Sequence, residues 1–297
     1  MNERHLDGTR RLKAVLGASL LIAVVAGTAS PASGATQRTI QADYVALGDS
    51  YASAPGVPDQ IDQACARSSS NYPHLVAGEN NLRLTDVSCS GSTTDDLSAA
   101  QGGAPAQLDA LSRETDLVTV TIGGNDIGFS EVIGQCAALA PDNPTGKPCT
   151  TSLTQGGADQ VEQSIAAAAP KVAKVLSDVH RRAPGAKVVL VSYPSLFPDS
   201  GVGCADAGFA TGDFAYLRDR TKSLNTMLAR QAKRGGATYV DTYQPTVGHD
   251  MCSPVGERWI ESLAPRSAAA PAHPNALGER AMAKALRQAL ARCGYRR

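Results

Sequence analysis

The chain has 297 residues, of which 28 are basic and 28 are acidic, so its formal net charge is zero. Binding of nucleic acid through bulk charge requires a basic excess or a basic stripe, and the sequence has neither. Hydrophobic residues make up 42% and charged residues 19%, a balance that allows the chain to bury a core. We therefore expect a globular protein that does not bind nucleic acid.

The first 35 residues have the composition and order of a secretory signal peptide. Basic residues come before an uncharged apolar run at 14–27, and small residues follow it as far as Ala35. A spanning helix needs roughly 18–20 apolar residues, more than this run contains. We predict cleavage after Ala35, by either the Sec or the twin-arginine route. Residues 36–297 should then form a single secreted domain that is not integrated into a membrane.

Short β-rich segments alternate with longer helical segments from Asp43 onward. The patterns predict strands at 44–47, 82–87, 117–122, 187–191 and 238–240, and helices at 71–80, 155–182, 214–233 and 276–292. Pro170 should kink or break the second helix. The stretches 138–158 and 264–272, rich in Gly, Ala and Pro, should be surface loops. This alternation predicts one α/β domain with a mainly parallel sheet, whose chemistry gathers at the carboxyl ends of the strands.

All seven cysteines follow residue 35, where export would expose them to oxidising conditions. No C-x-x-C or H-x-x-x-H spacing indicates a metal site. Six cysteines can pair in many ways, and chain proximity favours Cys65–Cys89, Cys136–Cys149 and Cys204–Cys252. Cys293 is then left over, as a buried bystander, a free thiol or an intermolecular link.

The first three predicted strands lead into motifs that suit acyl transfer. A Gly-Asp-Ser motif after the first strand could present the Ser50 hydroxyl as a nucleophile. The second strand leads to Gly91, where the backbone can approach a ligand closely. The third leads through two glycines to Asn125, whose amide could donate to an oxyanion. Taken alone, each motif is explained at least as well by a turn or a helix cap, and a turn beside a disulfide is the better explanation of the Gly91 motif.

A serine nucleophile needs a base, and histidine is the side chain that titrates nearest neutral pH. Four histidines follow residue 35: His74, His180, His249 and His273. His74 falls on a predicted amphipathic helix, and His180 at a charged helix end where it should be solvated. His249, next to Asp250, is the rival candidate. His273, in a loop before the last helix, is the preferred base.

Together, Ser50, Gly91, Asn125 and His273 resemble the four blocks of the GDSL family of SGNH hydrolases, in the family's order. The resemblance covers about residues 42–292 and is greatest to the secreted actinobacterial esterase and lipase branch. It implies a three-layer α/β/α sandwich with a flavodoxin-like sheet. Members of that branch typically carry three sequential disulfides, which supports the pairings above.

By this resemblance, Ser50 is the nucleophile, and His273 is the general base and then the general acid. The backbone N–H groups of Ser50 and Gly91, with the Asn125 side chain, would form the oxyanion hole. Asp49 and Asp126 belong to the same motifs, and we interpret both as residues that organise turns through hydrogen bonds.

One position departs from the family pattern. Most members place an aspartate three residues before the histidine, but this chain has Ala270 there and no carboxylate anywhere in 264–272. Some members of the secreted branch use a main-chain carbonyl instead. We therefore expect the Ala270 carbonyl to accept a hydrogen bond from His273 Nδ1–H, which gives a Ser–His dyad instead of a side-chain triad.

The resemblance implies a secreted serine esterase or lipase that cleaves small-molecule or lipid esters without metal or cofactor. We expect it to be a monomer, although no feature of the sequence bears on the oligomeric state. Lipase, phospholipase A and acetyl-carbohydrate esterase activities all remain open. Two alternatives are acyl transfer to an acceptor other than water and a catalytically silent binding protein, whose only support is the missing acid. Trp259, the single tryptophan, could line an acyl or sugar site or pack in the core.

Overall fold

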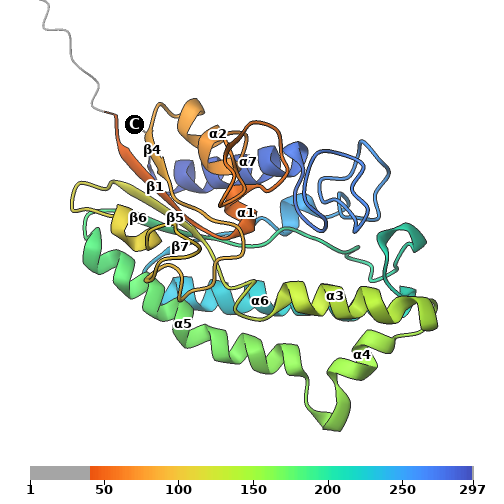
Figure 1. Ribbon diagram of the computed structural model, residues 1–297. Helices are drawn as coiled ribbons and strands as arrows, with labels where there is room; N and C mark the ends of the chain where they lie inside the picture. The colour runs from red at the N-terminus through yellow and green to blue at the C-terminus, as the bar shows by residue number, and fades with distance from the viewer. Residues whose placement is uncertain (1–40, 296–297) are drawn as a thin grey trace, which may run out of the picture. The chain divides into compact units, whose positions relative to one another are not determined.

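Five parallel strands form the central sheet of the computed structural model, which describes residues 41–295 (Figure 1). The strands are β1 (Asp43–Gly48), β4 (Arg83–Asp86), β5 (Leu117–Thr121), β6 (Lys187–Val191) and β7 (Thr238–Val240). Their spatial order is β4-β1-β5-β6-β7. Numbered along the chain within this sheet alone, that order is 2-1-3-4-5, the doubly wound order of flavodoxin-like folds. The predicted fold class is therefore confirmed.

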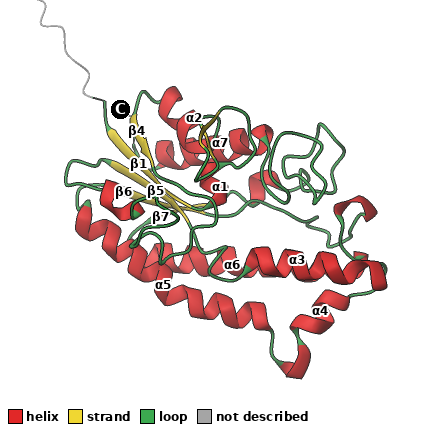
Figure 2. Ribbon diagram, viewed as in Figure 1, coloured by secondary structure: helices red, strands yellow, loops and turns green. Residues whose placement is uncertain are grey.

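Both faces of the sheet are covered by helices (Figure 2). One face packs against α2 (Tyr72–Glu79) and α7 (Ala276–Arg292), and the other against α5 (Gln160–Arg182) and α6 (Phe214–Arg234). Alternate β1 side chains serve the two layers: Tyr44 joins the α2–α7 core, and Val45 joins the α5–α6 core. Burial on both faces explains why the strands read as nearly continuous β-branched runs in the sequence.

The second predicted helix is not broken at Pro170, although a break was one of the two outcomes that we expected there. α5 begins at Gln160, where the Asp159 side chain accepts a hydrogen bond from the Glu162 N–H, and it runs through Pro170 to Arg182. Proline removes one helical donor, but buried apolar residues on both sides of Pro170 anchor the helix to the core. Tertiary packing therefore outweighs the local preference.

The stretch 138–158 is not the plain surface loop that we expected. It contains the end of α3 (Phe129–Leu139) and the short helix α4 (Pro148–Leu153). The Asp213 carboxylate accepts from the backbone N–H groups of Cys149 and Thr150, which caps the start of α4 from a distant segment. A helix that depends on such a remote partner has little signal in its own sequence.

Two small elements lie outside the sheet and its covering helices. The one-turn helix α1 (Ser50–Ser53) follows β1, and a separate hairpin pairs β2 (Gln60–Asp62) with β3 (Arg67–Ser68). Neither was predicted, because both are too short to show a periodicity.

The three disulfides are the pairs that chain proximity favours: Cys65–Cys89, Cys136–Cys149 and Cys204–Cys252. Cys293 is free and exposed, so it is not the buried bystander. It directly follows Arg292, the last residue of α7.

The described residues, 41–295, belong to one compact unit. The predicted signal peptide, residues 1–35, lies outside the described residues. Within 41–295, no helix combines the length and the apolar character needed to cross a bilayer.

Candidate active site

The carboxyl end of β1 presents Ser50 at the edge of the sheet. The Asp49 side chain accepts from the Tyr51 N–H at 3.0 Å and caps α1, so Ser50 becomes the first helical residue. A side chain at Gly48 would place its Cβ only 2.6 Å from the Thr121 carbonyl oxygen, so glycine is required for the strand to enter the turn. The Ser50 side chain is left accessible at one side, with the residue 7% exposed.

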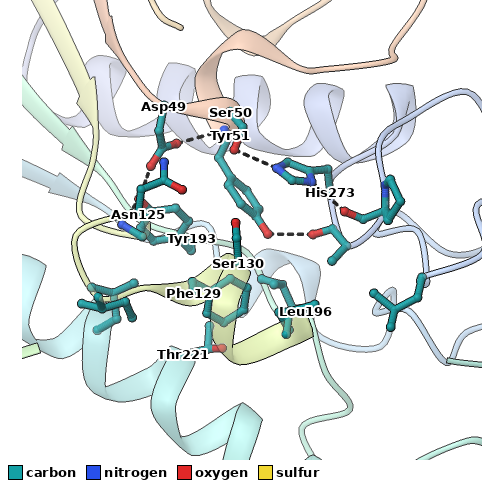
Figure 3. Close-up of a pocket in the computed structure, with 17 residues that line it drawn as sticks. Asp49, Ser50, Tyr51, Asn125, Phe129, Ser130, Tyr193, Leu196, Thr221 and His273 are labelled. Carbon is teal, nitrogen blue, oxygen red and sulfur yellow. Dashed lines mark hydrogen bonds between the residues drawn. The ribbon is translucent and has the colours of Figure 1, made fainter. Parts of the chain in front are cut away.

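Ser50 and His273 come together although 223 positions separate them in the sequence. Ser50 Oγ lies 2.7 Å from His273 Nε2, and His273 Nδ1 lies 2.7 Å from the Pro271 carbonyl oxygen (Figure 3). A carbonyl can only accept, so Nδ1 carries the proton and Nε2 is free to accept from the serine hydroxyl. Burial lowers the pKa of His273 below its ordinary value of 6.5, which favours this neutral form.

The carbonyl that contacts His273 Nδ1 is not the one we expected. Ala270 instead accepts from the backbone N–H of His273, at 3.2 Å. Ala272 adopts a left-handed conformation with φ of 60° between Pro271 and His273. This turn leaves the Pro271 carbonyl, not that of Ala270, within hydrogen-bond distance of the imidazole. The predicted acceptor Ala270 is therefore corrected to Pro271.

The residues expected to form an oxyanion hole come from neighbouring loops. Asn125 lines the same cavity as Ser50 and His273, and its Nδ2 donates to the Ser92 carbonyl at 2.8 Å. Gly91 precedes Ser92 in the loop after β4 and has φ of 82°. It is not among the residues that line the cavity. The hydrogen bond from Asn125 to Ser92 nevertheless joins the loop after β5, which carries Asn125, to the loop after β4, which carries Gly91.

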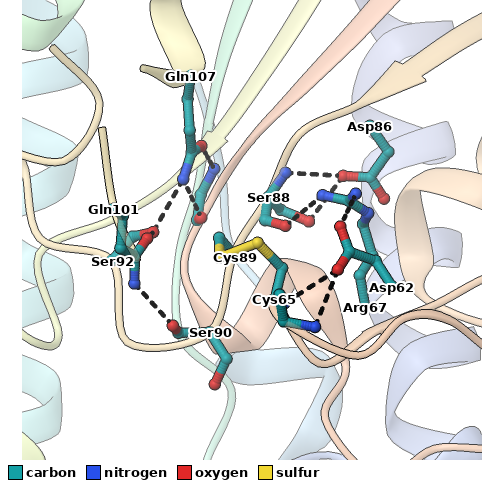
Figure 4. The surroundings of a disulfide bond; sticks show 12 residues. Asp62, Cys65, Arg67, Asp86, Ser88, Cys89, Ser90, Ser92, Gln101 and Gln107 are labelled. Carbon is teal, nitrogen blue, oxygen red and sulfur yellow. Dashed lines mark hydrogen bonds and ion pairs between the residues drawn. A yellow bond between two sulfur atoms is a disulfide. The ribbon is translucent and has the colours of Figure 1, made fainter. Parts of the chain in front are cut away.

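A buried glutamine that the sequence analysis did not single out connects these loops (Figure 4). Gln107 accepts from the Gly48 N–H at 2.7 Å and donates to the Gly48 carbonyl at 2.9 Å. The same amide donates to Ser92 Oγ at 2.9 Å. Gln101 then donates to the Ser90 carbonyl and accepts from the Ser92 hydroxyl. A single network therefore joins the backbone before Ser50 to the loop that carries Gly91.

Asp49 is part of a second buried network. Its carboxylate accepts from the Tyr193 hydroxyl, and that hydroxyl accepts from the Gly124 N–H at 2.7 Å. Burial raises the pKa of Asp49 to about 7. Asp126 accepts from the backbone and side chain of Thr94. Both carboxylates thus hold turns together, which is the role that we assigned to them.

A cavity of about 210 Å³ opens beside the serine and histidine. Its wall is largely apolar and includes Ile127, Phe129, Ile133, Leu196, Leu224 and Leu263. Phe129 and Leu196 are drawn in Figure 3 together with Ser130 and Thr221, which add hydroxyl groups to the wall. The site can therefore receive an apolar group next to the serine hydroxyl.

The other three histidines of the described residues lie outside the cavity wall. The rival base His249 stacks on Trp259, with 3.6 Å between ring centroids, and its Nδ1 lies 2.8 Å from the Glu257 carbonyl. His74 Nδ1 lies 2.8 Å from Asn71 Oδ1. His180 is half-buried, with Nε2 at 2.8 Å from the Gly235 carbonyl, instead of solvated as we expected. Trp259 likewise does not line the cavity.

Within residues 41–295, no group of three or more His, Cys, Asp and Glu side chains is arranged to hold a metal ion.

Known proteins resemble this chain over most of its length. A family model described as the GDSL-like lipase/acylhydrolase family matches residues 46–281. Lipase 2 of Streptomyces coelicolor is 40% identical, over 89% of this chain and 94% of that protein. A lipase of Streptomyces rimosus is 31% identical, over 85% and 88% of the two chains.

Solved structures extend the comparison to the fold. Phospholipase A1 from Streptomyces albidoflavus aligns with a TM-score of 0.71 at 28% identity, over 84% of this chain and 99% of that one. The extracellular lipase of Streptomyces rimosus aligns with a TM-score of 0.66 at 29% identity, with the same coverage of the two chains. The chain therefore belongs to the GDSL-like lipase/acylhydrolase family and is a carboxylic-ester hydrolase.

Proposed function

We propose that the enzyme hydrolyses esters through an acyl-serine intermediate with a Ser50–His273 dyad. The observation that carries this proposal is the 2.7 Å contact between Ser50 Oγ and His273 Nε2, with Nδ1–H held by a carbonyl. His273 takes the serine proton as Oγ attacks the ester carbon, and returns it to the departing alcohol oxygen. Water then attacks the acyl-serine, again through His273, which releases the acid and restores the hydroxyl.

The oxyanion of each tetrahedral intermediate would be bound by the backbone N–H groups of Ser50 and Gly91 and by Asn125 Nδ2. An amide nitrogen carries two hydrogens, and the Ser92 carbonyl accepts one of those of Asn125. The second remains for the substrate, in an orientation that the first hydrogen bond helps to set. Such preorganised donors are the usual source of the largest rate contribution in acyl transfer.

The dyad lacks a carboxylate to stabilise the imidazolium that forms in the transition state. The Pro271 carbonyl is neutral, so it sets the tautomer but stabilises the positive charge less than an aspartate would. A silent binding protein is disfavoured, because binding alone would not need a serine hydroxyl held against a neutral imidazole. Acyl transfer to another acceptor uses the same groups, and only its products differ.

The substrate that the cavity favours is an ester with an apolar acyl chain, as in lipase or phospholipase A reactions. The supporting observation is the apolar wall beside Ser50, because burial of methylene groups there would contribute binding energy. Binding of a sugar would be expected to use a more polar wall, so acetyl-carbohydrate esterase activity is less well supported.

We further propose that the enzyme is secreted after removal of residues 1–35 and acts as a monomer formed by residues 36–297. Three disulfides favour an oxidising compartment. A single chain supplies the dyad and every proposed oxyanion donor, so the site needs no second copy. Mass spectrometry of the secreted protein would test the cleavage site, and light scattering would test the oligomeric state.

Hydrolysis of p-nitrophenyl esters of increasing chain length by residues 36–297 tests the activity. Ser50→Ala and His273→Ala should each abolish turnover, and His249→Ala should leave it near wild type. Wild-type turnover in His273→Ala, together with its loss in His249→Ala, would contradict the assignment. Product analysis with a competing alcohol separates hydrolysis from acyl transfer.

A further inference from the structure

The residue that follows the nucleophile reaches across to the histidine loop. Tyr51, on the one-turn helix α1, is only 5% exposed. Its hydroxyl donates to the Ala272 carbonyl at 2.7 Å, across 221 positions of sequence. Its ring stacks on the His273 imidazole, with 4.8 Å between centroids and 30° between planes (Figure 3). Tyr51 therefore contacts both the base and the residue before it.

The hydroxyl of Tyr51 binds the strained point of the histidine loop. Ala272 has φ of 60°, a left-handed conformation that costs an alanine free energy. This residue lies between Pro271 and His273, so its conformation sets how the Pro271 carbonyl meets Nδ1. The buried hydrogen bond from Tyr51 to the Ala272 carbonyl stabilises the strained turn. If the turn relaxed, this hydrogen bond would break, and loss of a buried hydrogen bond costs free energy.

The ring of Tyr51 is itself held in place. It forms a T-shaped contact with the Tyr193 ring, with 5.0 Å between centroids and 83° between planes. The Tyr193 hydroxyl is bound to the Asp49 carboxylate, next to the nucleophile. Tyr51 thus packs against both the Tyr193 ring and the imidazole, and it presents one ring face to the imidazole. A ring face is the part of an aromatic side chain that attracts a cation.

We propose that Tyr51 is a positioning residue that carries out two tasks of the absent carboxylate: it orients the imidazole of His273, and it stabilises the positive charge of that ring. The hydroxyl holds the turn that places the Pro271 carbonyl on Nδ1, and the ring fixes the plane of the imidazole. The ring face also stabilises the imidazolium that forms when Ser50 loses its proton. This inference rests on the proposed Ser–His mechanism. It adds Tyr51 as a third side chain, which sets the orientation of the histidine.

Two substitutions separate these contributions. Tyr51→Phe removes the hydroxyl and keeps the ring, and Tyr51→Leu removes both while keeping the position apolar. Tyr44→Phe is the matched control, because it also removes a buried tyrosine hydroxyl, one that bonds to Thr119 Oγ1 in the other core. For each variant kcat, KM, the pH dependence of kcat/KM and the melting temperature are measured on a p-nitrophenyl ester.

We expect Tyr51→Phe to lower kcat about fivefold, the factor expected for one modest hydrogen bond, with the acidic pH midpoint unchanged. Tyr51→Leu should lower kcat on the order of a hundredfold with little change in KM. Its acidic midpoint should move to lower pH, because without the ring face the imidazolium is less stable and loses its proton more readily. Tyr44→Phe should keep kcat within about twofold of wild type, because its hydroxyl is remote from the site.

The proposal is overturned if Tyr51→Leu keeps kcat within about threefold of the wild-type value. The same holds if the loss of activity equals the loss of folded protein in the preparation. It is also overturned if the Leu variant keeps the wild-type pH midpoint. If Tyr51→Leu does not fold, Tyr51→Phe decides, through kcat and the proton resonance of His273 Nδ1–H. A wild-type kcat with an unchanged resonance refutes the role of the hydroxyl.

A parallel Ser50→Ala measurement separates this inference from the proposed function. Turnover that depends on Ser50, combined with wild-type behaviour of both Tyr51 variants, leaves the dyad standing and removes Tyr51 from it. Turnover that does not depend on Ser50 refutes the dyad itself.

Discussion

The carbonyl oxygen of Pro271 accepts a hydrogen bond from His273 Nδ1 at 2.7 Å. A neutral main-chain group therefore sets the tautomer of the histidine that contacts Ser50. A carbonyl orients the imidazole but stabilises its positive charge little. The pH dependence of the activity and the contributions of the other groups in the site should therefore reflect the missing carboxylate.

The pH dependence of kcat/KM should show an acidic limb with its midpoint below 6.5. Burial lowers the pKa of His273 from 6.5, and the base is active only when neutral. Activity is therefore full above that lowered pKa and is lost as the pH falls through it. Asp49, with its pKa raised to about 7, also titrates in the site. The profile should be repeated with Asp49→Asn, and a limb that disappears in this variant would assign the titration to Asp49.

Replacement of Asn125 by alanine should lower kcat on the order of a hundred- to a thousandfold, with a much smaller change in KM. The amide would be lost from the oxyanion, where charge develops only after the substrate has bound. Asn143→Ala, in an exposed segment, is the matched control and should behave as wild type. Equal losses in kcat/KM and affinity, with kcat unchanged, would instead place Asn125 in ground-state binding.

Replacement of Gln107 by leucine should lower the free energy of unfolding by about 2–3 kcal/mol. The leucine fills a similar volume but leaves the buried N–H of Gly48 without its partner. The Gly48 carbonyl loses one of its two donors and keeps only the Cys89 N–H. We also expect kcat to fall, because the loop that carries Gly91 loses its link to the backbone before Ser50.

Urea unfolding and steady-state kinetics of the same preparations test both effects of Gln107→Leu. Gln163→Leu, on the exposed face of α5, is the control for adding an apolar side chain. A destabilised Gln107→Leu protein with wild-type kcat would limit the glutamine to a structural role.

Acyl-chain preference should respond to the size of residue 130. Ser130 lines the cavity near Tyr51 but is exposed, so a tryptophan there can narrow the cavity without crowding the core (Figure 3). We expect Ser130→Trp to lower kcat/KM about tenfold or more for a p-nitrophenyl decanoate, and to leave the acetate within about threefold. Ser177→Trp, on α5 outside the cavity wall, controls for surface tryptophan. A uniform loss over all chain lengths would place the acyl group elsewhere.

The sheet and the order of its motifs could be predicted from the sequence because both are local patterns. A buried parallel strand such as β6 is a continuous β-branched run, and its bounds, Lys187–Val191, are those that we predicted. Strand ends identify Ser50 and Asn125 for the same reason, since parallel strands deliver their carboxyl ends to one edge. No periodicity would have selected His273; comparison of the four histidines favoured it as the base, and the likeness of four ordered blocks to a known family then supported that choice.

The tertiary structure decided the features that depend on residues far apart in the chain. The left-handed turn at Ala272 moved the acceptor of His273 from Ala270 to Pro271, and a lone alanine carries no sign of that conformation. Helix α4 depends on a cap from Asp213, and Tyr51 finds its partner at Ala272. A chain segment specifies its own strand or turn, but a hydrogen bond between distant segments exists only once packing has brought them together. The Ser50 motif was therefore readable in the sequence, whereas the groups that orient its base were not.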